Sequence, residues 1–259
     1  MPSIKLNGIV TRYADYKDND RMLTLFTYEQ GLVSCAARGC RRAKSPLMGA
    51  SELFVSGEFV LFSANDKLTL DSAEISEHYY PLREDIDRFA AASYMLSIVN
   101  AGAEETANRP LFTLLRYALA YTAYAEVNPT DMAICFALKC LMALGYRPSI
   151  TECALCSKDL RRQSSAAFSA RFGGALCDSC ARAISAQDIS PLSLEAMRRM
   201  LIMKDSEINR VVLPEKQRAE LKQAVNSFAE FALEKKFRAI DMIEPPNALT
   251  LIELCVIFS

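Results

Sequence analysis

Short runs of apolar residues alternate with polar ones over the first eighty positions of the chain, and turn residues separate the runs. The runs are residues 4–10, 22–27, 32–37, 58–62 and 67–75. A polar stretch at 15–20, Gly31 and Gly57 stand between them. Alternation in several short runs is typical of half-buried strands. The pattern predicts a five-stranded antiparallel barrel over residues 1–80.

The period of the apolar positions becomes helical after Pro81. One helical face runs from Ile86 to Gly102, and further segments begin with a proline. These segments start at Pro110, Pro129, Pro191 and Pro214, the last continuing to about Phe237. Proline at the start of a helix and glycine at its end are typical of helices in proteins. We predict an α-helical domain in two parts, residues 81–150 and 183–240.

Four cysteines lie in the segment 151–182 that interrupts the helices. Cys153 and Cys156 form one C-x-x-C pair, and Cys177 and Cys180 form a second one after a spacer of twenty residues. Each pair can place two sulfurs on one side of a tight turn, and a spacer of ~15–20 residues lets the pairs complete a tetrahedron. We predict one structural Zn²⁺ ion, because four thiolates leave no position for a reacting water. The alternatives are unrelated cysteines or a redox pair.

The other five cysteines do not suggest a disulfide framework. The total of nine is odd, and no export leader is evident, so reduced thiols in a cytosol are expected. Cys35, Cys135, Cys140 and Cys255 lie in apolar runs and are interpreted as small buried side chains. Cys40 differs, because it lies among arginines.

Composition argues against several classes of function. The chain has 259 residues, of which 51% are apolar, and its formal charge of −1 gives no overall attraction to nucleic acid or membrane. The best apolar stretch, residues 132–146, is too short to span a bilayer. The single histidine, His78, has no catalytic pattern around it, and no glycine-rich phosphate motif occurs. We therefore expect a cytoplasmic protein that is not an enzyme.

A basic segment follows the third predicted strand. Its cations are Arg38, Arg41, Arg42 and Lys44. If the strands close into a barrel, this segment joins strands three and four, where it could line a groove that follows a phosphate backbone. Arg12 and Arg21 lie on or beside the flanking strands. The residues alone leave a DNA-binding site and a solvated loop equally open.

Aromatic residues in the same region could stack on nucleic-acid bases. They are Tyr13, Tyr16, Phe26 and Tyr28. Most of them are interpreted as core or rim residues of the barrel.

Several short segments stand in a specific order along most of the chain. They are Gly8–Val10, Asp20–Thr27 with Gly31, Ala37–Ser45, Tyr80–Arg83, Leu144–Pro148, the pair Cys153 and Cys156, and Phe168–Ser169 leading to Gly173–Cys180. This order of segments resembles the RecO family of bacterial recombination-mediator proteins. The resemblance implies an N-terminal OB-fold, a helical domain and a zinc-binding insertion.

The same resemblance implies a function in DNA repair and recombination. Such proteins bind single- and double-stranded DNA, anneal complementary strands and assist loading of the RecA recombinase. They work with RecR and recognise the acidic, apolar C-terminal tail of the single-strand-binding protein SSB. A nucleoid-associated bacterial protein is expected on this basis. Some members lack the cysteines, so the zinc should be architectural.

The resemblance also turns the basic side chains into expected DNA contacts. These are Arg38, Arg41, Arg42 and Lys44, with Arg12 and Arg21 as further candidates. The alternative function is a zinc-containing adaptor that binds proteins and not DNA, with the barrel as a support. A hydrolase or transferase has no nucleophile–base pair in its favour. The last predicted segment is an apolar C-terminal tail, residues 241–259. Residues 247–259 of this tail match no family motif, and they either pack on the helical domain or dock a partner.

Overall fold

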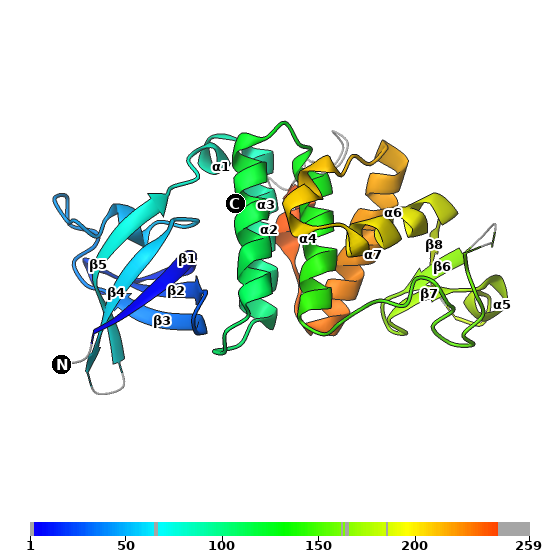
Figure 1. Cartoon of the computed structure of the whole chain (residues 1–259), viewed down its shortest axis with the longest axis horizontal. Coiled ribbons are helices and arrows are strands. Elements are labelled where there is room, and N and C mark those ends of the chain that lie inside the picture. The colour runs from blue at the N-terminus through cyan, green and yellow to red at the C-terminus, as the bar shows by residue number, and fades with distance from the viewer. Residues whose placement is uncertain (1–2, 65–66, 162, 164–165, 185, 243–259) are drawn as a thin grey trace, which may run out of the picture.

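The computed structural model describes residues 3–64, 67–161, 163, 166–184 and 186–242, and Figure 1 shows a barrel, a helical layer and a small sheet in a row. The barrel strands are β1 (Ser3–Tyr16), β2 (Asp20–Thr27), β3 (Gly31–Ala37), β4 (Ser56–Ala64) and β5 (Lys67–Glu77). They close in the order β1-β2-β3-β5-β4, with β3 and β5 parallel and the other neighbours antiparallel. The predicted five-stranded barrel is confirmed, but it is not wholly antiparallel, because β3 and β5 pair in parallel where the barrel closes.

Alternation along the strands fills the barrel. Leu23 and Leu25 of β2 and Val33 and Cys35 of β3 are buried inside it. The residues between them point to the other face of the sheet, because successive side chains of a strand alternate. Met22 of β2 and Ser34 of β3 therefore lie on the outer face.

A β-bulge in β1 changes which of its side chains point outward. The register of β1 against β2 shifts between Val10 and Arg12, so that Thr11 is the additional residue. Val10, before the bulge, is buried in the barrel, whereas Arg12 and Tyr16 after it are exposed. The bulge therefore moves the even-numbered side chains of β1 from the interior to the outer face.

The helical domain holds the bulge in place through α2 (Ile86–Gly102). Thr11 Oγ1 donates to Asn100 Oδ1 at 2.7 Å, and Asn100 Nδ2 donates to the carbonyl of Thr11 at 3.0 Å. The two parts also share an apolar interface, where the Phe26 ring of β2 lies 5.9 Å from the ring of Phe112. Phe26 is therefore a core residue and is not available to stack on a base.

The predicted helix starts are confirmed. The helices are α1 (Pro81–Glu84), α2, α3 (Arg109–Tyr124), α4 (Pro129–Ala143), α6 (Pro191–Ile202) and α7 (Glu215–Ala232). Capping side chains accept from the first free backbone N–H groups of four of them. These caps are Asp85, Asn108, Asn128 and Ser190. None of the helices in the described ranges has the length and apolar character that a membrane span requires.

The last long helix ends earlier than the apolar pattern predicts. It stops at Ala232 and not near Phe237. Glu234 adopts a positive φ of 51°, and the Glu230 carboxylate accepts from the backbone N–H of Phe237 at 3.2 Å. The turn brings the Phe237 ring into the core, 6.1 Å from the ring of Tyr94. Phe237 is therefore apolar because its ring is buried in the core, although the residue lies outside the helix.

Helix α4 is the centre of the helical domain and contacts α2, α3, α6 and α7. Every residue from Thr130 to Leu141 is buried, including two charged ones. Asp131 accepts from Arg218 Nε at 2.6 Å and from the backbone N–H of Leu213 at 2.9 Å. Lys139 donates to the carbonyl of Met203 at 2.8 Å. Both charges thus attach the segment between α6 and α7 to the central helix.

Short strands form the third part of the molecule. They are β6 (Ala166–Ser169), β7 (Gly174–Leu176) and β8 (Gln187–Ile189), in the order β7-β6-β8. The short helix α5 (Asp178–Ala181) follows β7. Strand β8 pairs with β6 although it lies beyond residue 182 in the chain. The tail expected at residues 247–259, with Cys255, lies outside the described residues.

Removing the buried carboxylate of Asp131 should destabilise the helical domain. Asp131→Ala leaves Arg218 partly buried without this partner and Leu213 N–H without its acceptor, a loss of about 3–5 kcal/mol. Urea unfolding followed by circular dichroism measures the change. Lys5→Ala removes the exposed ion pair of Lys5 with Glu58 and should leave the unfolding midpoint unchanged. Equal midpoints for both variants would contradict this role of Asp131.

Candidate nucleic-acid interface and metal site

The four predicted cysteines come together at one point. The sulfurs of Cys153, Cys156, Cys177 and Cys180 all lie within 4.8 Å of one another. The Sγ atoms of Cys156 and Cys177 are 3.6 Å apart. Sulfurs bound at ~2.3 Å in a tetrahedron would be ~3.8 Å apart, so this spacing fits a four-coordinate ion. The cluster could hold one metal ion.

Backbone geometry explains how each pair presents its sulfurs. The first pair lies on a tight loop, closed by the N–H of Cys153 donating to the carbonyl of Lys158 at 2.8 Å, with Ser157 at a φ of 57°. The second pair follows β7 and begins α5. The Cys177 N–H lies 3.4 Å from Cys153 Sγ, a contact that links the two pairs directly.

The two glycines before the second pair have the roles that their positions predict. Gly173 has a φ of 70°, which suits the turn between β6 and β7. A Cβ on Gly174 would lie 2.1 Å from the carbonyl oxygen of Ser149, so only glycine allows this approach of the two backbones. The turn at Gly173 and the close backbone approach at Gly174 keep the second pair of cysteines beside the first.

Hydrogen bonds shift the pKa values of the four cluster thiols in different directions, lowering those of Cys177 and Cys153, while bonds among the sulfurs raise those of Cys156 and Cys180. A hydrogen bond with the Ser179 hydroxyl lowers the pKa of Cys177 to about 6. By contrast, burial raises the pKa of both Cys35 and Cys135 to about 12. Those two and Cys140 are buried, as their apolar neighbours predict, and Cys40 is buried as well. Cys177 thus differs chemically from Cys35 and Cys135 of the core.

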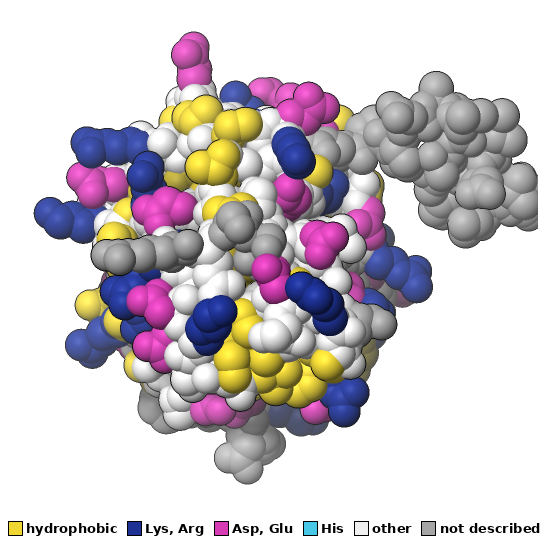
Figure 2. All heavy atoms as spheres, turned by 90° about the vertical axis from the view of Figure 1, so that its right-hand side faces the viewer, with side chains coloured by type: hydrophobic (Ala, Val, Ile, Leu, Met, Phe, Trp, Pro, Cys, Tyr) yellow, Lys and Arg dark blue, Asp and Glu magenta, His cyan; other side chains and the backbone are white. Residues whose placement is uncertain are grey.

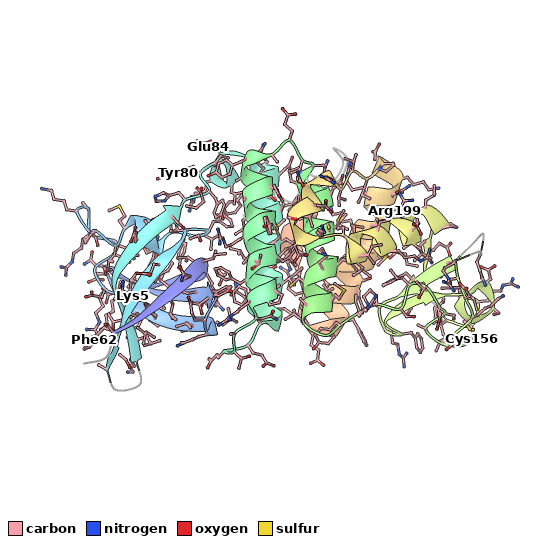
Figure 3. The ribbon with its side chains drawn as sticks, viewed as in Figure 1. Lys5, Phe62, Tyr80, Glu84, Cys156 and Arg199 are labelled. Carbon is pink, nitrogen blue, oxygen red and sulfur yellow. The ribbon has the colours of Figure 1, made fainter. Side chains whose placement is uncertain are left out.

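The cysteine cluster lies far from the barrel. Figure 3 shows Cys156 at the opposite end of the molecule from Lys5 and Phe62, which belong to β1 and β4. The surface at the cysteine end carries Lys and Arg interspersed with Asp and Glu (Figure 2). This end has no single-sign field, so a metal ion here would act on local structure.

A cleft of about 1020 Å³ lies on the outer face of the barrel. Its floor includes Met22 of β2 with Ser34 and Ala36 of β3. These residues are in register, because Met22 pairs with Ala36 and Thr24 pairs with Ser34. Lys67, Leu68 and Thr69 at the start of β5 line it as well. In OB-type barrels the strand 2–3 face between the β1–β2 and β4–β5 loops is where oligonucleotides bind.

Cations surround this cleft. Lys17, Arg38 and Lys67 line it, and all three are exposed. Two acids also line it, Asp20 and Glu105. The Asp20 carboxylate accepts from the backbone N–H of Gly39 at 2.8 Å, and this bond ties the start of the basic segment to the β1–β2 turn.

The rest of the basic segment is attached to the same turn. The Arg41 N–H donates to the carbonyl of Asn19 at 3.1 Å, and Cys40 is buried in the barrel core. The side chains of Arg41, Arg42 and Lys44 are exposed. Backbone contacts therefore hold the segment beside the cleft, although of its cations only Arg38 lines it. The Arg41 guanidinium also forms an ion pair with Asp15, in which Nη1 lies 3.4 Å from a carboxylate oxygen.

The two remaining predicted cations have different surroundings. Arg12 is exposed on the outer face, opposite Thr24 in the register, which places it in line with Ser34 of the cleft. Arg21 points to the other face. Its guanidinium bonds Asp15 and Glu52 and lies 4.0 Å from the centre of the Tyr13 ring.

Three residues that line the cleft lie outside the expected DNA contacts. Sequence reasoning names Tyr16 among the aromatic residues that could stack on bases, but it does not single out Lys17 or Lys67. All three lie at strand ends, Tyr16 and Lys17 beside the β1–β2 turn and Lys67 at the start of β5. The position of these loops in OB-type barrels could have identified Lys67, because β5 begins where the pattern predicts. The first strand instead continues to Tyr16, well beyond the predicted run 4–10.

Two family models together match nearly the whole chain. The model of the recombination protein O N-terminal domain matches residues 1–79, and that of its C-terminal domain matches residues 83–239. The chain belongs to the RecO family. The two matches meet at the boundary between the barrel and the helical domain.

Relatives in the RecO family support the assignment. A protein of Symbiobacterium thermophilum named DNA repair protein RecO is 31% identical over 250 residues, covering 94% of this chain and 98% of the relative. The protein of that name from Acetivibrio thermocellus is 29% identical over 248 residues, covering 94% and 97%. A third, from Alkaliphilus metalliredigens, is 34% identical over 178 residues, covering 68% and 72%.

The cysteine cluster should bind one metal ion per chain. We expect elemental analysis of the purified protein to find about one equivalent of zinc, because four thiolates favour this metal. Cys153→Ser combined with Cys177→Ser should remove the ion and expose the small sheet to protease, since binding of such an ion contributes ~10 kcal/mol or more to local folding. Cys135→Ala, a buried cysteine outside the cluster, is the control. Zinc retained in the double variant would exclude the site.

Proposed function

We propose that this chain is a DNA repair and recombination mediator that binds single-stranded DNA in the barrel cleft. The observation that carries the proposal is the cationic cleft on the strand 2–3 face of an OB-type barrel, bordered by an anchored basic segment. The name DNA repair protein RecO of the family relatives agrees with it. The net charge of the chain does not contribute to DNA binding, because it is only −1.

Phosphates and bases would be bound by different side chains. Arg38, Lys67 and Lys17 would neutralise phosphates, and Arg12, Arg41, Arg42 and Lys44 would extend the path of the backbone. Tyr16 and Met22 on the floor offer apolar surface for bases, which would stack without reading sequence. Arg21 would support the β1–β2 hairpin by holding Asp15, Glu52 and Tyr13 together, and this hairpin carries Tyr16 and Lys17.

Annealing of two strands needs no catalytic residue. The protein has to neutralise phosphates on both strands, hold them close to each other and release the duplex, so double-stranded DNA should bind as well. We propose that recruitment to DNA coated by SSB uses the SSB C-terminal tail, and that loading of RecA proceeds with RecR. The bound Zn²⁺ ion would hold the small sheet together and would take no part in chemistry.

Two cations of the cleft should set the affinity for single strands. We expect Arg38→Ala with Lys67→Ala to weaken binding and to lower the slope of log affinity against log salt by about 1.4, at ~0.7 for each lost phosphate contact. Fluorescence anisotropy of a labelled oligonucleotide at several salt concentrations measures both quantities. Lys5→Ala, an exposed barrel lysine outside the cleft lining, is the matched control.

If the double variant keeps both the affinity and the salt slope of the unmodified protein, the cleft is not the binding site. A protein that binds no DNA even at low salt would favour the adaptor function.

The basic segment should contribute phosphate contacts without affecting the metal site. Arg41→Ala with Arg42→Ala should weaken DNA binding and lower the salt slope, because both side chains are exposed beside the cleft. Metal content should stay at one ion per chain, since the cysteine cluster is at the other end of the molecule. An unchanged slope would exclude these two arginines from the site.

A further inference from the structure

A second depression of about 580 Å³ lies between the small sheet and α7. Its walls come from β6 with the turn after it, from β8, and from the C-terminal half of α7 with the residues that follow. They include Phe168, Arg171, Gln187, Gln223, Phe231 and Lys235. We call this depression the α7 groove. The barrel cleft and the α7 groove share no lining residue.

The side chains of the α7 groove combine an aromatic ring with cations. Phe231 is 54% exposed, so its ring is accessible from the groove. Arg171 and Lys235 are also exposed. The floor is rigid, because the buried Phe168 ring packs edge-on against Phe228 with the centroids 6.0 Å apart.

The acids of the α7 groove are partly neutralised. Glu230 accepts from Lys236 Nζ at 2.7 Å and from the backbone N–H of Phe237 at 3.2 Å. Glu234 is the other acid of the lining. With Arg171 and Lys235 facing one remaining carboxylate, the opening is weakly cationic. An exposed ring beside cations and amide side chains is the composition of surfaces that bind single-stranded nucleic acid.

One packing contact links the elements that border the two depressions. A Cβ placed on Gly102, the last residue of α2, would lie 3.0 Å from Leu233 Cδ2, so the end of α2 and the chain after α7 are in contact. Glu105 of the cleft follows Gly102 by three residues, and Glu234 of the groove follows Leu233 directly. Each depression thus has one lining residue within three positions of this contact.

We propose that the α7 groove holds a second single strand of nucleic acid while the barrel cleft holds the first. This inference rests on the proposed function and deepens it by assigning a site to the partner strand in annealing. Phe231 stacks on a base, and Arg171 and Lys235 bind the adjoining phosphates. Pairing would begin beside the contact between Leu233 and Gly102, which joins the elements that border the two depressions.

The test compares two activities of the metal-loaded full chain. In Phe231→Ala with Lys235→Ala, the affinity for one short labelled single strand should stay within about twofold, because the barrel cleft is intact. The rate at which two complementary oligonucleotides anneal should fall about tenfold or more, which corresponds to loss of one stacked base and one phosphate contact. Lys204→Ala, an exposed lysine outside both depressions, is the control and should anneal normally.

Other outcomes overturn the proposal in separate ways. Normal annealing by the Phe231/Lys235 variant excludes the α7 groove as a strand site and leaves an acidic peptide as its occupant. A parallel loss of single-strand affinity and annealing means that one strand runs through both depressions. If the unmodified protein binds a single strand but only Arg38→Ala with Lys67→Ala affects annealing, the proposed function stands without the groove. An unmodified protein that binds no strand refutes both.

Discussion

The packing of β1 and β2 against the helical domain decides which part of the barrel surface stays open. Side chains at the outer face of β2 alternate with the barrel core, and Phe26 at one end of this face is covered by Phe112. Four residues earlier, Met22 lies on the same face but is 38% exposed, because no helix covers it. One face of one sheet thus serves as an interface at one end and as a cleft at the other.

The Thr11 bulge decides which side chains of β1 reach this outer face. Without the extra residue, Arg12 and Tyr16 would point to the interior with Val10, where a buried arginine would be costly. Asn100 of the helical domain bonds both the hydroxyl and the carbonyl of Thr11. The helical domain therefore shapes the proposed binding face, and of its residues only Glu105 is among the described residues that line the cleft.

Much of the fold could be predicted from the sequence, because it depends on local patterns. Strand alternation, proline at helix starts and the spacing of Cys153 and Cys177 all act within short segments. What could not be predicted depends on contacts between distant segments. The bulge requires Asn100, the early end of α7 requires the burial of Phe237, and β8 joins a sheet from outside the expected insertion. The candidate site shows the same division. Arg38 can be predicted from the basic segment in the sequence, whereas Lys67 becomes part of the site only because the barrel closes.

The central claim is that a single strand lies across β2 and β3 in the barrel cleft. Photocrosslinking tests it most directly, using the full chain and an oligonucleotide that carries 5-iodouracil, with crosslinked peptides identified by mass spectrometry. The account predicts crosslinks to Tyr16 and Met22, which are exposed beside the cleft cations. Crosslinks confined to the helical domain or to the cysteine end, with none in the barrel, would contradict it.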